Sequence, residues 1–175
     1  MVPIIRRIDP EDWARARDLR LEALADPAAA VAFLDTLEVA RARPDEFWIE
    51  RAARASHGGE ALQLLAEDGE TLVGTVTVLV QGAGSADYFG AIIPERRAIL
   101  VGVYLAPAAR GTGLIGALVE RAVEWSRAQG LALLHLDVHA DNPRARAAYE
   151  RLGFRATGHE FETAMGHELQ MARAL

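Results

Sequence analysis

Apolar residues recur at helical spacing in the first third of the chain and in strand-like runs after it. Asp9-Pro10 is typical of a helix start, with aspartate as the N-cap and proline in the first turn, and it predicts a helix to about Ala25. Asp26-Pro27 repeats this signal and predicts a second helix, whose inner face carries Phe33, Leu34 and Leu37. After Pro44-Asp45, a third helical piece continues to the turn at 57–59.

Strand signals precede and follow these helices. A β-branched run from Pro3 to Ile8 predicts a first strand, and residues 61–66 and 71–80 predict two more, joined by Asp68-Gly69, a pair that tight hairpins prefer. A loop from Gln81 to Arg96 leads to a buried strand over 97–105, which Pro107 ends. The remaining pattern predicts helices over 111–129 and 142–152 and strands over 131–138, 154–162 and 168–175. Helices, then an antiparallel meander, then a βαβ unit predict an α+β (mixed α/β) fold around a mixed sheet.

The composition of the chain indicates a globular protein without a membrane span. With 175 residues, 51% of them apolar and 25% charged, the chain fits a single globular domain over 1–175. No apolar run approaches the roughly 18 residues of a membrane span, and Met1 to Arg7 lacks the apolar core of a signal peptide. Cysteine is absent, which excludes disulfides and thiolate chemistry. The absence of cysteine also favours a cytoplasmic location, and without an apolar run we expect no membrane contact. The net charge of −6 argues against nucleic acid as the main partner.

The most informative stretch runs from Val101 to Gly116, where a strand, a glycine-rich turn and a helix follow one another. The first turn of a helix leaves its N–H groups unpaired and carries partial positive charge. Gly111 and Gly113 would let a ligand approach that backbone without meeting a Cβ. The pattern predicts a phosphate or pyrophosphate site, although tight packing alone would also explain the glycines.

A second helix carries candidate chemistry. Asn142 and Tyr149 are seven residues apart, about two turns, and share one face with the small Ala145 between them. A slender ligand fits such a groove, and the phenol is a suitable proton donor to a thiolate leaving group. Two plainer interpretations stay open, since Asn142 before Pro143 is also a good N-cap and Tyr149 also suits a core position.

Together these two stretches resemble the GNAT-type N-acetyltransferases. Residues 110–116 resemble the family's loop for the pyrophosphate of acyl-CoA, and Asn142, Ala145, Tyr149 and Gly153-Phe154 resemble its second motif, N-x-x-A-x-x-x-Y-x-x-x-G-F. One position departs, because Ile115 stands where the loop pattern has its last small residue and glycine comes one later. The resemblance implies a mostly antiparallel sheet of six to seven strands, flanked by helices, with a splayed parallel strand pair at the cofactor site.

The resemblance also implies roles for individual residues. Acetyl-CoA would be the co-substrate, without a metal, and Tyr149 would protonate the departing CoA thiolate. The residues expected to bind the cofactor are Val103, Leu105, Arg110, Gly111, Thr112, Gly113, Leu114, Ile115, Gly116, Asn142 and Ala145. The acceptor would be the amine of a small molecule or peptide, and a homodimer through the terminal strands is common in the family.

Neither the general base nor the acceptor follows from the sequence. His135, Asp137 and His139 alternate on one strand and suit either a proton relay or packing, while Glu95 and Tyr104 are further candidates near the central strand. Acidic residues of the N-terminal helices are candidates to hold a cationic amine: Glu22, Asp35, Glu38 and Glu46.

Two other functions fit parts of the sequence. Residues 111–116 match G-x-G-x-x-G, which favours an NAD(P)-binding oxidoreductase domain, but Pro107 and Arg110 lengthen the turn and few residues follow for a second half. A non-catalytic acyl-CoA-binding module is the other alternative, although it would not need the phenol of Tyr149.

Overall fold

The computed structural model describes residues 3–87 and 90–175. Residues 1–2, within the N-terminal segment discussed above, and 88–89, within the predicted loop, lie outside the described residues. The strands are β1 (Ile4–Arg7), β2 (Ala61–Asp68), β3 (Thr71–Gln81), β4 (Arg97–Leu105), β5 (Leu133–His139), β6 (Arg155–Thr163) and β7 (Gly166–Ala174). The helices are α1 (Trp13–Ala25), α2 (Leu37–Ala42), α3 (Asp45–Ser56), α4 (Leu114–Ala128) and α5 (Pro143–Arg151), with short 3-10 turns η1 (Pro10–Asp12), η2 (Ala29–Val31) and η3 (Pro107–Ala109).

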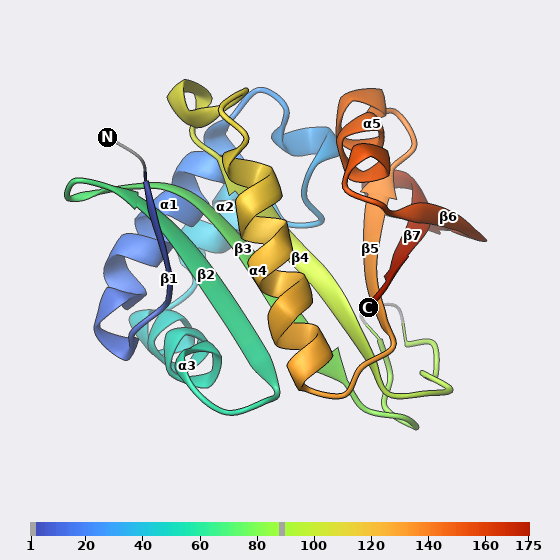
Figure 1. The fold of residues 1–175 in the computed structure, drawn as a ribbon. Coiled ribbons are helices and arrows are strands. Elements are labelled where there is room, and N and C mark those ends of the chain that lie inside the picture. Colours follow the sequence, from blue (N-terminus) through green and yellow to red (C-terminus); the bar gives the residue numbers. More distant parts are fainter. Residues whose placement is uncertain (1–2, 88–89) are drawn as a thin grey trace.

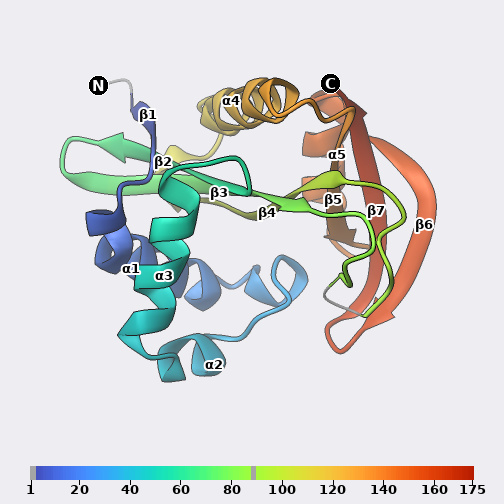
Figure 2. The same cartoon turned by 90° about the horizontal axis from the view of Figure 1, so that it is seen from below.

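The strands form one seven-stranded sheet in the order β1-β2-β3-β4-β5-β7-β6, with helices on both faces (Figures 1 and 2). β4 and β5 run parallel and pair only at Ala98–Leu134 and Ile99–His135, while the other described neighbours are antiparallel. The predicted sheet, mostly antiparallel with one splayed parallel pair, is confirmed.

A β-bulge in β4 marks where the two strands separate. The register with β3 jumps between Thr75, opposite Tyr104, and Thr77, opposite Val101. Gly102 adopts a φ of 61°, which favours glycine, and it accommodates the extra residue. Because a bulge bends its strand, β4 turns away from β5 beyond this point.

Apolar side chains pack on both faces of the sheet. On one face, α4 buries Leu118, Val119, Ala122 and Val123 against β2 to β5, at the spacing that the sequence predicts. On the other face, α1 and α3 cover the sheet around Trp48 (Figure 2). None of the helices in the described ranges combines the length and the apolar content needed to cross a bilayer.

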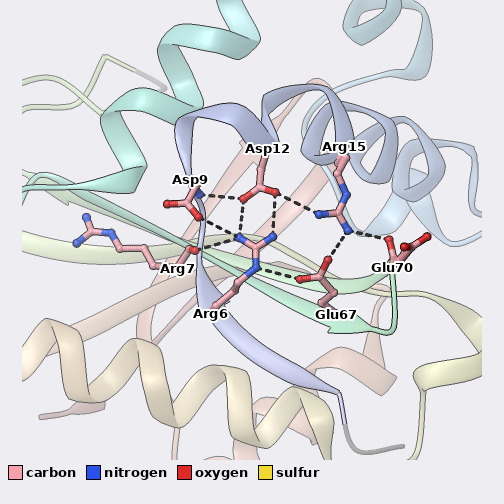
Figure 3. A network of polar contacts seen from close by, with 7 residues as sticks. All are labelled: Arg6, Arg7, Asp9, Asp12, Arg15, Glu67 and Glu70. Atoms are coloured by element: carbon pink, nitrogen blue, oxygen red, sulfur yellow. Dashed lines mark hydrogen bonds and ion pairs between the residues drawn. The ribbon is translucent and has the colours of Figure 1, made fainter.

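A charged network fixes the start of α1 to the sheet (Figure 3). Arg6 of β1 donates to both carboxylate oxygens of Asp12, at 2.5 and 2.9 Å, and to Glu67 of β2 at 3.0 Å. Arg15 of α1 also bridges Asp12 and Glu67. The side chain of Asp12 is only 9% exposed, and its hydrogen bonds with Arg6 lower the pKa of its carboxyl to about 2.

The prediction of a helix that begins at Asp26-Pro27 is wrong. Only the turn η2 forms there, and α2 begins later, at Leu37, behind an N-cap in which Thr36 accepts the N–H of Val39. The carboxylate of Asp26 accepts the N–H of Ala28 and the Arg110 guanidinium, so it stabilises a turn instead of a helix. Leu34, expected on an inner face, is 46% exposed, whereas Phe33 is buried.

Candidate active site

The splayed ends of β4 and β5 lie at the same end of the molecule as the first turn of α4 and helix α5 (Figure 1). The loop between α1 and α2 also reaches this end, where Asn142 donates to the carbonyl of Val31 at 3.0 Å. The two motifs that carry the sequence resemblance are therefore adjacent in the fold.

The glycine-rich loop presents a row of N–H groups without protein partners. The first backbone bond of α4 is donated by Ala117 to the carbonyl of Gly113, at 3.3 Å. No described residue accepts a hydrogen bond from the backbone N–H groups of residues 111–116. Gly111 and Gly113 have φ values of 78° and 85°, and a Cβ at either would meet nothing within 4 Å. Such open, partially positive backbone fits the oxygens of a pyrophosphate.

Neighbouring side chains hold this loop in shape. The hydroxyl of Thr112 donates to the carbonyl of Ala109 at 2.7 Å, and Leu114 is buried beneath the first turn of α4. Ile115 is half-buried and packs against the core. A Cβ at Gly116 would lie 3.5 Å from Leu152, so this glycine sits where α4 meets the end of α5. At the position that departs from the family pattern, the Ile115 side chain therefore has apolar contacts with the core.

The side chain of Arg110 is engaged beside the loop. Its guanidinium pairs with Asp26, donates through Nε to the carbonyl of Leu105 at 3.0 Å, and lies 5.8 Å from the ring centroid of Tyr104. Its backbone N–H donates to Pro107. In this arrangement Arg110 ties the loop to α1 and β4, and a direct phosphate contact by its side chain stays a prediction.

One edge of β4 is open beside the loop. Ala106 donates its N–H to Val73 of β3, and N–H groups along a strand alternate in direction. The N–H groups of Val103 and Leu105 therefore point to the opposite edge, where β5 no longer pairs with β4. This edge can accept an extended ligand as an added strand, and Arg110 already occupies the Leu105 carbonyl.

Asn142 caps α5. Its side-chain oxygen accepts the N–H of Ala145 at 3.1 Å, as the plainer interpretation predicts, and its amide nitrogen donates to Val31. Ala145 is half-buried and packs against the core. A cofactor contact by either residue stays a prediction.

Tyr149 is half-buried, and the edge of its ring contacts Phe154 with a centroid distance of 5.8 Å. Its hydroxyl has no hydrogen-bond partner among the described residues. Burial raises the pKa of Tyr149 to about 12, so the phenol keeps its proton at neutral pH. The group is therefore in the state that a general acid requires.

The candidates for a general base differ in their surroundings. His139 accepts the backbone N–H of Asp141 at Nδ1 and donates from Nε2 to the carbonyl of Met165, so both ring nitrogens are occupied. His135 lies at the closed end of the splay and donates to Ala98. Burial raises the pKa of Asp137, which accepts from Gln170 at 3.5 Å.

The two remaining candidates for the general base are either hydrogen-bonded or exposed. Tyr104 donates to Glu22 at 3.0 Å, burial raises the pKa of this phenol to about 12, and Glu95 lies exposed in the loop before β4.

The acidic residues proposed to hold a cationic amine do not form one site. Glu38 and Glu46 are exposed, and Asp35 pairs with Arg20 and Arg43. No sequence motif indicates this pair of arginines, because Arg20 lies in α1 and Arg43 directly follows α2.

Comparisons with known proteins agree with this geometry. The model of the acetyltransferase (GNAT) family matches residues 27–154. The mycothiol acetyltransferase of Beutenbergia cavernae is 32% identical over 120 residues, which are 68% of this chain but 34% of that protein, so the chain spans about a third of this curated relative. The acetyltransferase of the GNAT family from Streptococcus pneumoniae has a TM-score of 0.77 at 19% identity, with 99% of each chain covered. The PaiA N-acetyltransferase of Thermoplasma acidophilum, in complex with coenzyme A, has a TM-score of 0.76 at 19% identity, with 100% of each chain covered.

Proposed function

Because the chain belongs to the acetyltransferase (GNAT) family, we propose that it transfers the acetyl group of acetyl-CoA to the primary amine of a small molecule or peptide. The observation that carries the proposal is the row of backbone N–H groups over residues 111–116 that have no partner among the described residues. Gly111 and Gly113 leave open space around this backbone, and the splayed strands β4 and β5 lie beside it. These groups suit the pyrophosphate of acetyl-CoA, and the open edge of β4 at Val103 and Leu105 suits its pantetheine arm.

The mechanism follows from these positions. Acetyl-CoA supplies the acetyl group as a thioester, and a main-chain N–H at the β4 edge polarises the thioester carbonyl. The amine nitrogen forms the new C–N bond while the C–S bond breaks. Tyr149 gives its hydroxyl proton to the departing sulfur, and the proton lost by the amine restores the phenol through solvent. No covalent enzyme intermediate is required.

The oxidoreductase alternative has little support from the fold. Dinucleotide-binding domains of that type are built on a doubly wound parallel sheet, whereas β4–β5 is the parallel pair among the described strands. The non-catalytic module shares the predicted acyl-CoA site and differs in having no turnover, so kinetics must separate it from an enzyme.

The test is thiol release from acetyl-CoA in the presence of a panel of primary amines, with the acetylated product identified by mass. The chain contains no lysine, so acetylation of the enzyme's own ε-amines contributes no background. We expect amine-dependent thiol release and a melting temperature that rises with acetyl-CoA but not with NAD. Stabilisation by acetyl-CoA without thiol release would favour the binding module, and stabilisation by NAD alone would overturn the proposal.

A further inference from the structure

A small hollow with a mixed polar and apolar lining is formed by residues of the sheet and of α1 and α3. These two helices cover the face of the sheet opposite α4 (Figure 2). Its floor includes Gln63 of β2 and Thr77 of β3, both buried, and Gly102 of the β4 bulge forms one wall. The hydroxyl of Thr77 donates to no described residue. The hollow therefore touches the point where β4 separates from β5, next to the proposed path of the thioester.

A buried hydrogen-bond donor without a partner among the described residues belongs to a residue that lines this hollow. Trp48 of α3 lines it and is only 5% exposed, yet its indole Nε1 has no hydrogen-bond partner among the described residues. Arg43, which does not line the hollow but shares Asp35 with Arg20, also has a buried Nε without a hydrogen-bond partner in the described part of the chain. Since buried polar groups are almost always paired, and both of these nitrogens only donate, the missing partner is a hydrogen-bond acceptor.

Positive charge accompanies these donors. Arg20 and Arg51 line the hollow from α1 and α3. The carboxylate of Asp35 forms ion pairs with both Arg20 and Arg43, with N–O distances of 3.9 and 3.6 Å. Both distances are longer than those of good hydrogen bonds. Burial, with the nearby charge of Arg51, lowers the pKa of Arg20 to about 10, so the guanidinium stays charged at neutral pH.

The size of the hollow limits what it can hold. Its volume of about 20 Å³ is little more than a single water molecule needs. One oxygen of a hydrogen-bond-accepting group fits this space, so the rest of a ligand must extend beyond it. Gly102, which lines the hollow, lies on the side of the splayed strands.

We propose that this hollow binds the carboxylate of the acceptor, so that the acceptor class is a primary amine that also carries a carboxylate, such as a free amino acid. The inference rests on the proposed transfer to amines and adds the group by which the acceptor is recognised. The carboxylate accepts hydrogen bonds from Trp48, Thr77 and the arginines, and the amine faces the β4 bulge. This proposal differs from the expectation that acidic residues of the N-terminal helices hold the cationic amine, because here the recognised group is the carboxylate.

The test compares matched acceptors in the native enzyme. Free amino acids and their C-terminal amides, namely those of glycine, leucine, methionine, phenylalanine and glutamate, are assayed pairwise by thiol release at about pH 8. A carboxylate raises the pKa of the neighbouring ammonium group, so the amide has more reactive free amine and any bias opposes the prediction. Because charge-assisted hydrogen bonds are at stake, we expect at least one acid to exceed its amide in kcat/KM by about 10- to 100-fold, mainly through KM.

Variants then assign this preference to the hollow. Arg51→Gln should reduce the acid-to-amide ratio toward one, because it lowers kcat/KM for the acid more than for the amide. Arg54→Gln, an exposed arginine on the same helix that does not line the hollow, should keep the ratio. If Arg51→Gln does not fold, Thr77→Val, which replaces a hydroxyl by a methyl group, is expected to lower the ratio as well.

Each result is decisive. Equal turnover of acids and amides would overturn the inference and leave the acetyltransferase proposal intact. The inference would also be overturned if Arg51→Gln and Thr77→Val left the preference for acids unchanged, because the carboxylate would then bind at another site. Equal losses for acid and amide would mean that these residues are only structural. Absence of turnover with every amine would instead contradict the proposed function itself.

Discussion

Replacing Asp12 with asparagine removes the carboxylate at the centre of the network that fixes α1 to the sheet (Figure 3). The network lowers the pKa of Asp12 from 3.8 to about 2. At about 1.4 kcal/mol per pH unit, ionised Asp12 contributes about 2 kcal/mol to the free energy of unfolding at neutral pH. Arg6 keeps Glu67 as a partner, so we expect Asp12→Asn to lose about 2–3 kcal/mol rather than the full cost of stranding a buried charge.

The pH dependence of this loss has a definite sign. A folded-state pKa below the unfolded value stabilises the fold above the unfolded pKa, and the contribution disappears as pH falls through the folded pKa. The difference between the native protein and Asp12→Asn should therefore be full above about pH 5 and roughly halved near pH 3.

Urea denaturation followed by circular dichroism, at a series of pH values, measures this difference. Asp18→Asn is the matched control, because Asp18 lies on the same helix with its side chain 67% exposed and pairs with Arg17. It should change the free energy of unfolding by less than about 0.5 kcal/mol. A loss in Asp12→Asn that does not shrink between neutral pH and pH of about 3 would refute the assignment of the stabilisation to the ionised carboxylate.

Three further substitutions test the site and its support. Tyr149→Phe should lower kcat by about 100-fold or more while leaving the Kd for acetyl-CoA within about twofold, by steady-state kinetics and calorimetry; equal losses in both would make the hydroxyl a binding group. Gly113→Ala, at a φ of 85°, should weaken acetyl-CoA binding and cost about 1–2 kcal/mol of stability, whereas Gly58→Ala, at a φ of 67° away from the site, should cost stability alone; parallel calorimetry and thermal melts compare them, and unchanged affinity in Gly113→Ala would count against the loop. Gly166→Ala places a Cβ 2.4 Å from Nε2 of His139 and should lower the melting temperature by several degrees; an unchanged melting temperature would mean that this contact relaxes freely.

Local signals in the sequence predict much of the fold. The strand over 97–105 is found with its predicted bounds, because an apolar β-branched run ahead of Pro107 has few other structures open to it. The helix predicted from 111 begins at Leu114, since Gly113 takes a positive φ that an α-helix does not use. Asp26-Pro27 misleads because the same residue types start helices and stabilise turns, and the distant Arg110 decides between them.

The site is predictable where its residues are close in sequence. The loop over 111–116 and the Asn142–Tyr149 pair come from single helices and their caps, so spacing alone brings their members together. The bulge at Gly102 and the hollow beside it depend on contacts between distant segments. Arg20 and Trp48 meet there only because α1 and α3 cover the same face of the sheet, which no local pattern encodes.

The most direct test of the account is the amide NMR spectrum of the ¹⁵N-labelled protein, titrated with acetyl-CoA and, separately, with acetyl-pantetheine, which lacks the pyrophosphate. We predict that acetyl-CoA shifts the N–H resonances of Gly111, Gly113 and Gly116 most strongly, as expected for new hydrogen bonds to phosphate oxygens. Acetyl-pantetheine should leave these three resonances in place and perturb those of Val103 and Leu105. Saturating acetyl-CoA that leaves the glycine resonances unshifted would contradict the claim that these backbone groups hold the cofactor.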